Sequence, residues 1–479
     1  MRTTGSPRPR WKTASAKGIS EVAAVEAATT GTTGETDGVS PVAAPGGMDL
    51  LRFAAVGSVD DGKSTLIGRL LYDTKQLFDD QVAAVEAASA RRGIGAVDLS
   101  FITDGLRAER EQGITIDVAY RYAATPRRKF VIADCPGHVQ YTRNMATGAS
   151  TADLALVVVD VVSGLREQTR RHACIAALLG VGQFIVCANK MDLADWDERA
   201  YRAVAAEVSS LAARLGVGDC AVIPVSALHG DFVAERSDVA PWYDGPTVLE
   251  ALEAAPAGSW AAGHGTGHSR GARLPVQWVL RRPGGGRSYA GMVNGGALRP
   301  GEEVVVLPEG WRTTVTGIET YDGALDEAPV GISVAVDLAD DLDVSRGDML
   351  AAAGEPPSVT KDFAATVCWF ADRPLRSGDR LRVKHTTRTT PARIAAVRGR
   401  LDVNELSVQP ADELVNNDIG TVQLATAVPL AVDPYRHDRI TGSFVLIDEG
   451  TNATVAAGMV GEPDIVTPAG GTDPATSPG

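Results

Sequence analysis

Eight residues of this chain have the types and the spacing needed to hold a chain of phosphates. The segment GSVDDGKS, residues 57–64, fits the pattern GxxxxGK[ST] and directly follows the apolar run 51–56. Glycines at both ends let the backbone curl until several N–H groups point at one anion, and a helix starting there adds its positive end. Lys63 then reaches the β- and γ-phosphates, while the Ser64 hydroxyl coordinates Mg²⁺. The segment therefore predicts a nucleoside triphosphate site that uses magnesium.

The sequence Asn189-Lys190-Met191-Asp192 decides which base the triphosphate carries. It follows the apolar run 184–188, so it is expected in a loop at the carboxyl end of a sheet, where ligands bind. The Asp192 carboxylate can accept hydrogen bonds from N1–H and the 2-amino group of guanine, which adenine lacks. Adenine there would leave a buried carboxylate unpaired, at a cost of about 2 to 5 kcal/mol. We therefore expect GTP rather than ATP.

A shorter match, Ser226-Ala227-Leu228, follows the apolar run 222–225. Three residues alone would carry little information. Behind a phosphate loop and an NKMD sequence, they predict backbone contacts with the guanine oxygen.

Two further segments have the composition expected of groups that sense the γ-phosphate. DCPGH, residues 134–138, ends the apolar run 130–133. In it Asp134 is expected to hold Mg²⁺ through water, the Gly137 N–H to contact the γ-phosphate, and His138 to orient the attacking water. Upstream, the Thr115 hydroxyl in EREQGITID (109–117) is expected to close over Mg²⁺ only while the triphosphate is intact, which makes that loop a switch.

These motifs define one predicted site. His138 is its catalytic residue, and its metal ligands are Ser64, Thr115 and Asp134. The residues expected to contact the nucleotide are Gly57, Ser58, Val59, Asp60, Asp61, Gly62, Lys63, Ser64, Thr65, Asp134, Cys135, Pro136, Gly137, His138, Asn189, Lys190, Met191, Asp192, Ser226, Ala227 and Leu228.

The elements that must position this site are short apolar runs separated by helix-length segments. Such continuous runs indicate buried parallel strands, so residues 48–256 are predicted to form an α/β domain of the P-loop GTPase type. Residues 257–272, rich in Gly, Ala and His, are predicted to be a linker. Beyond them, closely spaced β segments with turn signals, interrupted at GEPP, predict two small antiparallel β-barrels over 273–354 and 358–460.

Both ends of the chain have compositions that cannot form a core. Residues 1–47 are rich in Ala, Thr, Gly and Ser, and 461–479 in Pro, Gly and Thr, so a disordered extension and a disordered tail are expected. The apolar pattern begins abruptly at Leu50, which suggests Met48 as the true start.

Composition excludes several classes of protein. A net charge of -14 over 479 residues argues against a protein whose main function is to bind nucleic acid. The five cysteines include no CxxC pair, and no apolar run approaches the roughly 20 residues needed to cross a bilayer. A cytoplasmic protein with no membrane association is expected.

The motifs and the two β domains resemble the translation-factor superfamily of GTPases. Within it, the chain is more similar to the large, GTPase subunit of bacterial sulfate adenylyltransferase, over about residues 50–459. The segments that carry this resemblance are GSVDDGKSTLIGRLLYD (57–73), TDGLRAEREQGITIDVAYRY (103–122), YTRNMATGAS (141–150), GPTVLEALE (245–253), SRGDML (345–350) and TGSFVLIDEGTNATVAAGM (441–459).

The resemblance implies a GTP-hydrolysing subunit of a hetero-oligomer. Such a subunit partners a smaller catalytic subunit that binds ATP and sulfate, and couples GTP hydrolysis to formation of adenosine 5′-phosphosulfate and pyrophosphate in sulfate assimilation. Two residues depart from the family pattern, since Val139 replaces a frequent Glu and Cys135 a frequent Thr. No role of that glutamate is transferred to this chain.

The alternative is a GTPase of the same superfamily that delivers aminoacyl-tRNA. Its third domain would need a basic surface, and one basic run is the candidate: Lys384, His385, Arg388, Arg393, Arg398 and Arg400. Basic residues spaced in this way are more typical of solvated charges along barrel strands. A stand-alone ATPase is opposed by the NKMD sequence.

Overall fold

The computed structural model describes residues 49–76, 99, 117–257, 271–282 and 285–463. The chain divides into two units, 1–47 and 48–479, and all described residues belong to the second. The predicted extension 1–47, most of the linker 257–272, most of the tail 461–479 and Thr115 lie outside the described residues.

A six-stranded sheet with the order β2-β3-β1-β4-β5-β6 forms the first part of the described chain. Every neighbouring pair is parallel except β2 and β3. The strands are β1 (Leu50–Gly57), β2 (Ala119–Ala124), β3 (Lys129–Asp134), β4 (Leu154–Asp160), β5 (Gln183–Asn189) and β6 (Asp219–Pro224). The helices are α1 (Lys63–Asp73), α5 (Thr142–Ala149), α6 (Glu167–Leu178), α7 (Glu198–Arg214) and α8 (Val248–Ala254), with 3-10 turns η1 (Val139–Tyr141) and η2 (Met191–Ala194).

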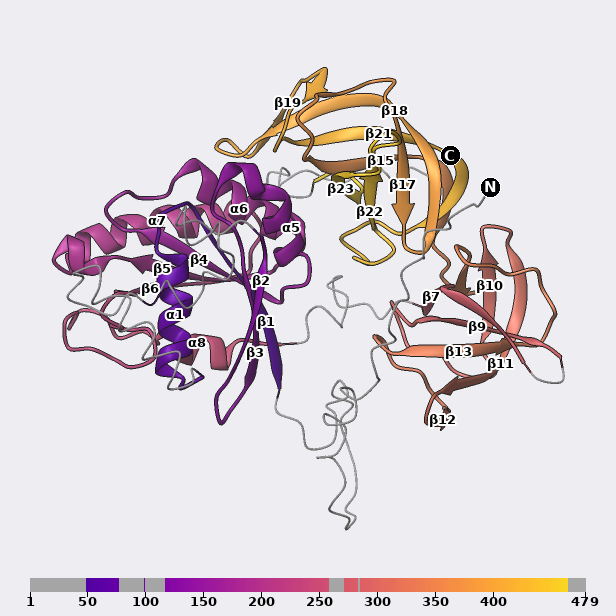
Figure 1. Cartoon of the computed structure of the whole chain (residues 1–479), viewed down its shortest axis with the longest axis horizontal. Helices are drawn as coiled ribbons and strands as arrows, with labels where there is room; N and C mark the ends of the chain where they lie inside the picture. The colour runs from indigo at the N-terminus through magenta and orange to yellow at the C-terminus, as the bar shows by residue number, and fades with distance from the viewer. Residues whose placement is uncertain (1–48, 77–98, 100–116, 258–270, 283–284, 464–479) are drawn as a thin grey trace, which may run out of the picture. The chain divides into compact units, whose positions relative to one another are not determined.

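Helices cover both faces of this sheet (Figure 1). Successive residues of β1 alternate between two cores: Ala54 and Val56 pack with α5, α6 and α7, whereas Phe53 and Ala55 pack with α1 and α8. Burial on both faces explains why the central strands are continuous apolar runs rather than alternating ones. The edge strand β2 has a partly exposed, Tyr- and Arg-containing sequence, and the apolar pattern did not predict it.

The carboxyl ends of the parallel strands meet at one edge and bring the predicted motifs together. In the register, Ala55 of β1 lies beside Asp134 of β3, and Gly57 beside Val158 of β4. Asp160, the last residue of β4, lies beside Asn189 of β5. The edge therefore gathers residues more than one hundred positions apart in sequence.

The second part is an eight-stranded antiparallel sheet with the path β7-β14-β10-β11-β13-β9-β8, and β12 pairs with β11. An isolated bridge between Arg273 of β7 and Asn294, just beyond β9, brings distant strands of the path together. The strands are β7 (Arg273–Pro275), β8 (Trp278–Arg281), β9 (Arg287–Met292), β10 (Glu303–Leu307), β11 (Trp311–Thr320), β12 (Gly323–Ala324), β13 (Ser333–Leu338) and β14 (Met349–Ala352).

The third part is a closed antiparallel barrel. Its path is β17-β22-β23-β15-β21-β18-β19, and the additional pairing of β17 with β18 closes the ring. Its strands are β15 (Ser358–Trp369), β17 (Arg380–His385), β18 (Arg388–Asp402), β19 (Ser407–Gln409), β21 (Ile419–Val432), β22 (Ser443–Ile447) and β23 (Thr454–Val460), and a separate pair is formed by β16 (Leu375–Arg376) and β20 (Glu413–Leu414). The predicted fold class, an α/β domain followed by antiparallel β-rich domains, is confirmed.

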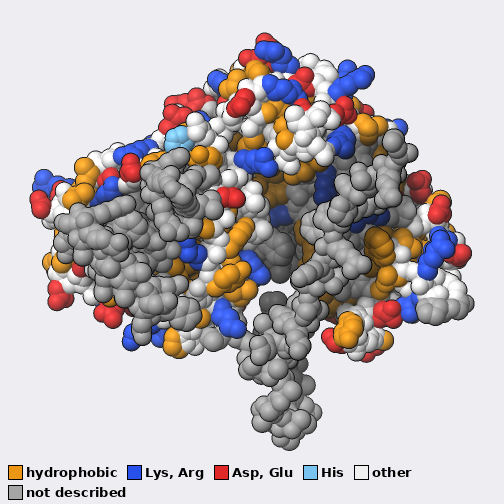
Figure 2. Space-filling model, in the orientation of Figure 1, with side chains coloured by type: hydrophobic (Ala, Val, Ile, Leu, Met, Phe, Trp, Pro, Cys, Tyr) orange, Lys and Arg blue, Asp and Glu red, His pale blue; other side chains and the backbone are white. Residues whose placement is uncertain are grey.

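Charged side chains of both signs are interspersed on the surface (Figure 2). In the basic run of the barrel, His385 is buried against the Thr441 carbonyl, and Arg388 pairs with Asp348. Arg398 pairs with Glu462 and Arg400 with Asp418. Four of the six residues of that run are therefore already neutralised or buried. Within the described residues, no helix is both long and apolar enough to span a membrane.

Candidate nucleotide site

The phosphate loop joins the end of β1 to the start of α1. Gly62 is the residue before the helix, with a φ of 92°, and a side chain there would collide with the Asn189 amide. Lys63, the first residue of α1, is buried, and its Nζ donates to the carbonyl oxygens of Gly57 and Ser58 at 3.2 and 2.6 Å. Burial lowers the pKa of Lys63, and the carboxylates of Asp134 and Asp61 oppose that shift. The ammonium is thus held within the curl of the loop, among groups that favour its charged form.

Asp61 braces the loop from inside. Its Oδ2 accepts from the Ser58 N–H at 2.8 Å and from the Thr169 hydroxyl of α6 at 3.2 Å. The Ser58 N–H also lies 3.2 Å from the Thr169 oxygen. Burial raises the pKa of Asp61, and these hydrogen bonds counteract the rise. Ser58 and Asp61 were both predicted to contact the nucleotide; what the structure shows is a hydrogen bond between them that stabilises the loop.

A buried histidine on α6 supports the start of the loop and was missed from the sequence. The Gly57 N–H donates to Nδ1 of His172 at 3.3 Å, and Nε2 of the same ring lies 2.7 Å from the Gln168 amide. Burial lowers the pKa of His172 to about 3, so the ring is neutral and Nδ1 remains an acceptor. The only sequence signal was position: α6 follows the buried strand β4, whose end faces the site.

The DCPGH segment packs directly on the phosphate loop. A Cβ on Gly137 would lie 2.4 Å from Lys63 Nζ and 2.9 Å from the Val59 nitrogen, which explains why glycine stands there. Asp134 is buried at the end of β3, and its charge acts on Lys63. Together with the Ser64 hydroxyl at the start of α1, this carboxylate supplies the hard oxygen donors that Mg²⁺ prefers, so the residues present fit that ion.

The neighbours of Gly137 differ in their surroundings. Cys135 is buried, and its Sγ faces the carbonyl oxygens of Ala133 and Met145 in the core rather than the loop. His138 is half-buried, accepts from the Gln140 N–H at 3.3 Å and packs against the Tyr141 ring. The ring therefore lies at the surface, one residue from the glycine that touches Lys63.

Asn189 connects the phosphate loop to the third motif. Its Nδ2 donates to the Asp61 carbonyl at 2.8 Å, and its Oδ1 accepts from the Ala227 N–H at 3.0 Å. The Ser226 N–H donates to the Asp231 carbonyl. These backbone groups of the SAL segment are used within the protein, so its role includes fixing Asn189, which the sequence pattern did not reveal.

Asp192 is oriented by a hydroxyl that the sequence did not assign to it. The Ser226 Oγ donates to Asp192 Oδ1 at 2.7 Å, and His229 Nε2 lies 4.0 Å from Oδ2. The side chain of Asp192 remains 20% exposed, so the carboxylate is accessible to a base. Met191 is fully buried in the core, whereas Leu228 is exposed. Of these residues, Asp192 has the chemistry and exposure to recognise guanine.

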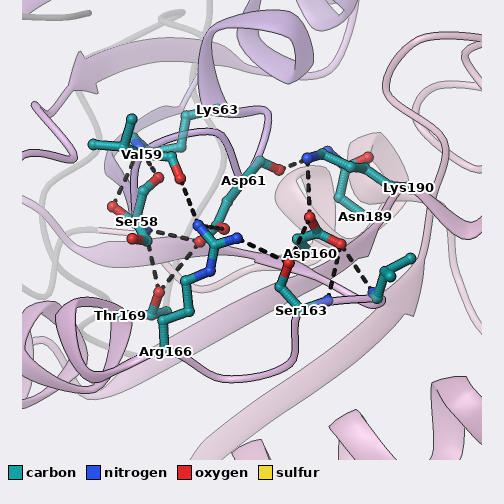
Figure 3. A network of polar contacts seen from close by, with 12 residues as sticks. Ser58, Val59, Asp61, Lys63, Asp160, Ser163, Arg166, Thr169, Asn189 and Lys190 are labelled. Carbon is teal, nitrogen blue, oxygen red and sulfur yellow. Dashed lines mark hydrogen bonds and ion pairs between the residues drawn. The ribbon is translucent and has the colours of Figure 1, made fainter. Parts of the chain in front are cut away.

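A polar network links the two ends of the site (Figure 3). Lys190 Nζ donates to Asp160 Oδ2 at 3.0 Å, and the Ser163 hydroxyl donates to the same oxygen at 3.1 Å. Burial raises the pKa of Asp160, but the hydrogen bond and charge of Lys190 and the hydrogen bonds from the Val162 and Ser163 N–H groups outweigh burial, so the pKa is lowered. Arg166, at the start of α6, contacts both Ser163 and the phosphate loop. Asp160, Ser163 and Arg166 were not predicted, since only the register of β4 places them here.

Two known protein families match parts of this chain. The family "Elongation factor Tu GTP binding domain" matches residues 48–256, and "GTP-eEF1A C-terminal domain-like" matches residues 362–461. Among solved structures, sup35 complexed with GDP covers 87% of this chain and 94% of its own at 24% identity, with a TM-score of 0.39. A similarity that low supports no functional argument.

Curated relatives are similar over most of the chain. The "Bifunctional enzyme CysN/CysC" of Mycobacterium tuberculosis (strain CDC 1551 / Oshkosh) is 54% identical over 417 residues, which are 86% of this chain and 67% of that protein. The "Sulfate adenylyltransferase subunit 1" of Aeromonas hydrophila is 48% identical over 415 residues, which are 86% of each chain. That of Laribacter hongkongensis is 47% identical over 86% of this chain and 85% of its own.

Proposed function

Because this chain belongs to the sulfate adenylyltransferase subunit 1 family of GTPases, we propose that it couples GTP hydrolysis to sulfate activation by a partner subunit. The partner is a smaller catalytic subunit that binds ATP and sulfate and releases adenosine 5′-phosphosulfate and pyrophosphate. The observation that carries the GTP half of the proposal is that one sheet edge gathers both ends of the site: Asn189 hydrogen-bonds Asp61 of the phosphate loop and the Ala227 N–H, and the neighbouring Ser226 donates to Asp192. The naming of the relatives as a subunit supports the partner.

The proposed nucleotide pose follows from the two ends of the site. The Lys63 ammonium and the loop amides hold the β- and γ-phosphates, and the Asp192 carboxylate accepts from guanine N1–H and the 2-amino group. Mg²⁺, held by Ser64, Asp134 and Thr115, would neutralise charge on the phosphate oxygens. His138, on the segment that touches the loop, orients the water that attacks the γ-phosphate.

Coupling needs a path from the nucleotide to the rest of the chain, and α6 supports one. Its start contacts the phosphate loop through Thr169 and His172. Beyond its end, the Leu179 carbonyl accepts from the Tyr435 hydroxyl at 3.0 Å, next to the closed barrel. A two-state switch supplies only its difference in binding energy, and a change from 1:99 to 99:1 requires about 5.5 kcal/mol. Contacts of Thr115 and Gly137 with the γ-phosphate are the proposed source.

The partner reaction explains why such coupling is useful. A sulfate–phosphate anhydride is unfavourable to form from ATP and sulfate, so a GTPase whose two states bind the catalytic subunit differently can drive it. We place the reaction in the cytoplasm, and the five free thiols are compatible with a reducing compartment. Delivery of aminoacyl-tRNA is disfavoured by the ion pairs that neutralise Arg388, Arg398 and Arg400.

The proposal is tested by mixing the purified chain with the small subunit, ATP, sulfate and Mg²⁺. Sulfate-dependent pyrophosphate release is expected to need the small subunit and to rise when GTP is added, whereas GDP is expected to give no rise. Pyrophosphate release by this chain without the partner, or release that ignores GTP, would contradict the coupling. Copurification of tRNA instead of a protein subunit would favour the alternative.

A substitution of His138 tests the proposed hydrolytic step. His138→Ala is expected to preserve GTP affinity and to slow hydrolysis by about 10- to 100-fold, since a misplaced water loses near-attack geometry. Single-turnover hydrolysis and equilibrium binding separate the two effects. His437→Ala is the matched control, because His437 lies beyond β21 and outside the candidate site. Unchanged turnover in His138→Ala would remove the proposed role.

A further inference from the structure

Arg166 reaches the phosphate loop from a position that no nucleotide-binding motif includes. It is the residue immediately before α6, its side chain makes no capping hydrogen bond with that helix, and the side chain is 39% exposed. The guanidinium NH1 donates to the Val59 carbonyl at 3.0 Å, and NH2 donates to the Ser163 hydroxyl at 2.8 Å. Figure 3 shows this side chain extending between the loop and Ser163.

The contact with Val59 determines which way one peptide group of the loop faces. A trans peptide is planar, so its C=O and the following N–H point in opposite directions. Holding the Val59 carbonyl against Arg166 therefore leaves the Asp60 N–H on the opposite side of that peptide, where a phosphate oxygen can accept from it. Arg166 thereby fixes the direction of an anion-binding amide without touching the nucleotide.

The backbone at this point does not hold that direction unaided. Asp60 has a φ of 65°, in the left-handed region that a residue with a side chain adopts at a cost. An outside contact is therefore needed to make this peptide orientation the preferred one.

A second charge interaction reinforces the contact. Arg166 NH1 lies 3.7 Å from Asp61 Oδ1, a buried oxygen that has no hydrogen-bond partner among the described residues. A positive charge close to this oxygen compensates for the solvation that the carboxylate loses on burial. Removing Arg166 would leave Asp61 both buried and less neutralised, at the centre of the loop.

The same arginine joins the phosphate end of the site to the base end. Ser163, which accepts from Arg166, donates to Asp160, and Asp160 accepts from Lys190 of the NKMD segment at 3.0 Å. We propose that Arg166 is a positioning residue that holds the phosphate loop in its anion-binding form and slows the release of GDP. The inference rests on the proposed nucleotide site and adds a determinant of nucleotide exchange to it.

Replacing Arg166 by methionine keeps the length of the side chain and removes its donors and charge. Release of a fluorescent GDP analogue from the full chain, followed by stopped-flow, is expected to accelerate about tenfold, with a much smaller change in the association rate. Arg166→Lys keeps the charge but cannot bridge the same partners, so an intermediate rate is expected. Ser163→Ala combined with Arg166→Met is expected to be non-additive, because the two share one hydrogen bond.

Arg170→Met is the matched control, since Arg170 lies on the same helix and pairs with Glu207 of α7. It is expected to release GDP at the parent rate. Equal acceleration in both methionine variants would overturn the proposal, because it would indicate a general loosening of α6. Parent-like release from Arg166→Met and Arg166→Lys would also overturn it, provided that Lys63→Ala loses binding in the same assay. If Lys63→Ala binds normally, the nucleotide site itself has been misassigned.

Discussion

Lys63→Ala is expected to lose roughly 100- to 1,000-fold in affinity for both GTP and GDP. The ammonium is buried in the curl of the phosphate loop, where a charge-assisted contact with phosphate is stronger than at an exposed position. Its removal also takes away a positive charge that interacts with Asp134 and Asp61, so the site becomes more negative where an anion must bind. Isothermal titration calorimetry with each nucleotide in the presence of Mg²⁺ measures the loss.

Lys129→Ala provides the comparison for Lys63. Lys129 is the first residue of β3, it is exposed, and it lies at the end of the sheet opposite the site. Both variants lose one positive charge, so a difference between their nucleotide affinities reports on the position of Lys63 in the site rather than on net charge. Circular dichroism melting should give similar transitions for both, and tight guanine nucleotide binding by folded Lys63→Ala would refute the assigned pocket.

Asp192→Asn is expected to weaken GTP binding by roughly 30- to 1,000-fold and to improve binding of xanthosine triphosphate. The carboxylate accepts from two donors of guanine, and an amide replaces one acceptor with a donor that faces the 2-amino group. Xanthine carries an oxygen at that position, so the amide N–H finds an acceptor there. Competition titrations with GTP, XTP and ATP report the change in preference.

The orientation of Asp192 by Ser226 makes this test specific. The hydrogen bond of 2.7 Å to Oδ1 fixes the plane of the carboxylate, and an asparagine oxygen can still accept it. Asp195→Asn, an exposed substitution three residues away, is the control and should leave all three affinities unchanged. A parent-like preference for GTP over XTP in Asp192→Asn would mean that another group reads the base.

Much of the candidate site could be predicted from local sequence. GSVDDGKS and NKMD are short segments whose residue types and spacing are typical of nucleotide binding. The continuous apolar runs before them predicted that each segment follows a buried strand. The strands β1, β3, β4, β5 and β6 coincide closely with those runs. The strand β2 escaped prediction because an edge strand is partly exposed and has no continuous apolar run.

The identity of the supporting groups depended on tertiary structure. His172, Thr169 and Arg166 lie more than one hundred residues from the phosphate loop, and only the parallel pairing of β1 with β4 brings α6 beside it. Strand pairing likewise brings Asn189, at the end of β5, to its two hydrogen-bond partners, Asp61 and Ala227. Sequence spacing contains no information on which of several polar residues at a sheet edge will face a given carbonyl.

The sequence by itself therefore predicted the chemistry of the candidate nucleotide site, because phosphate and base recognition depend on contiguous residues whose backbone conformation is set locally. Only the tertiary structure decided how those segments are held: the Asn189 amide donates to the Asp61 carbonyl, the Ser226 hydroxyl donates to Asp192, and Arg166 bridges the phosphate loop and Ser163. Hydrogen bonds between distant segments depend on strand order and register, and these are properties of the whole sheet rather than of any one segment.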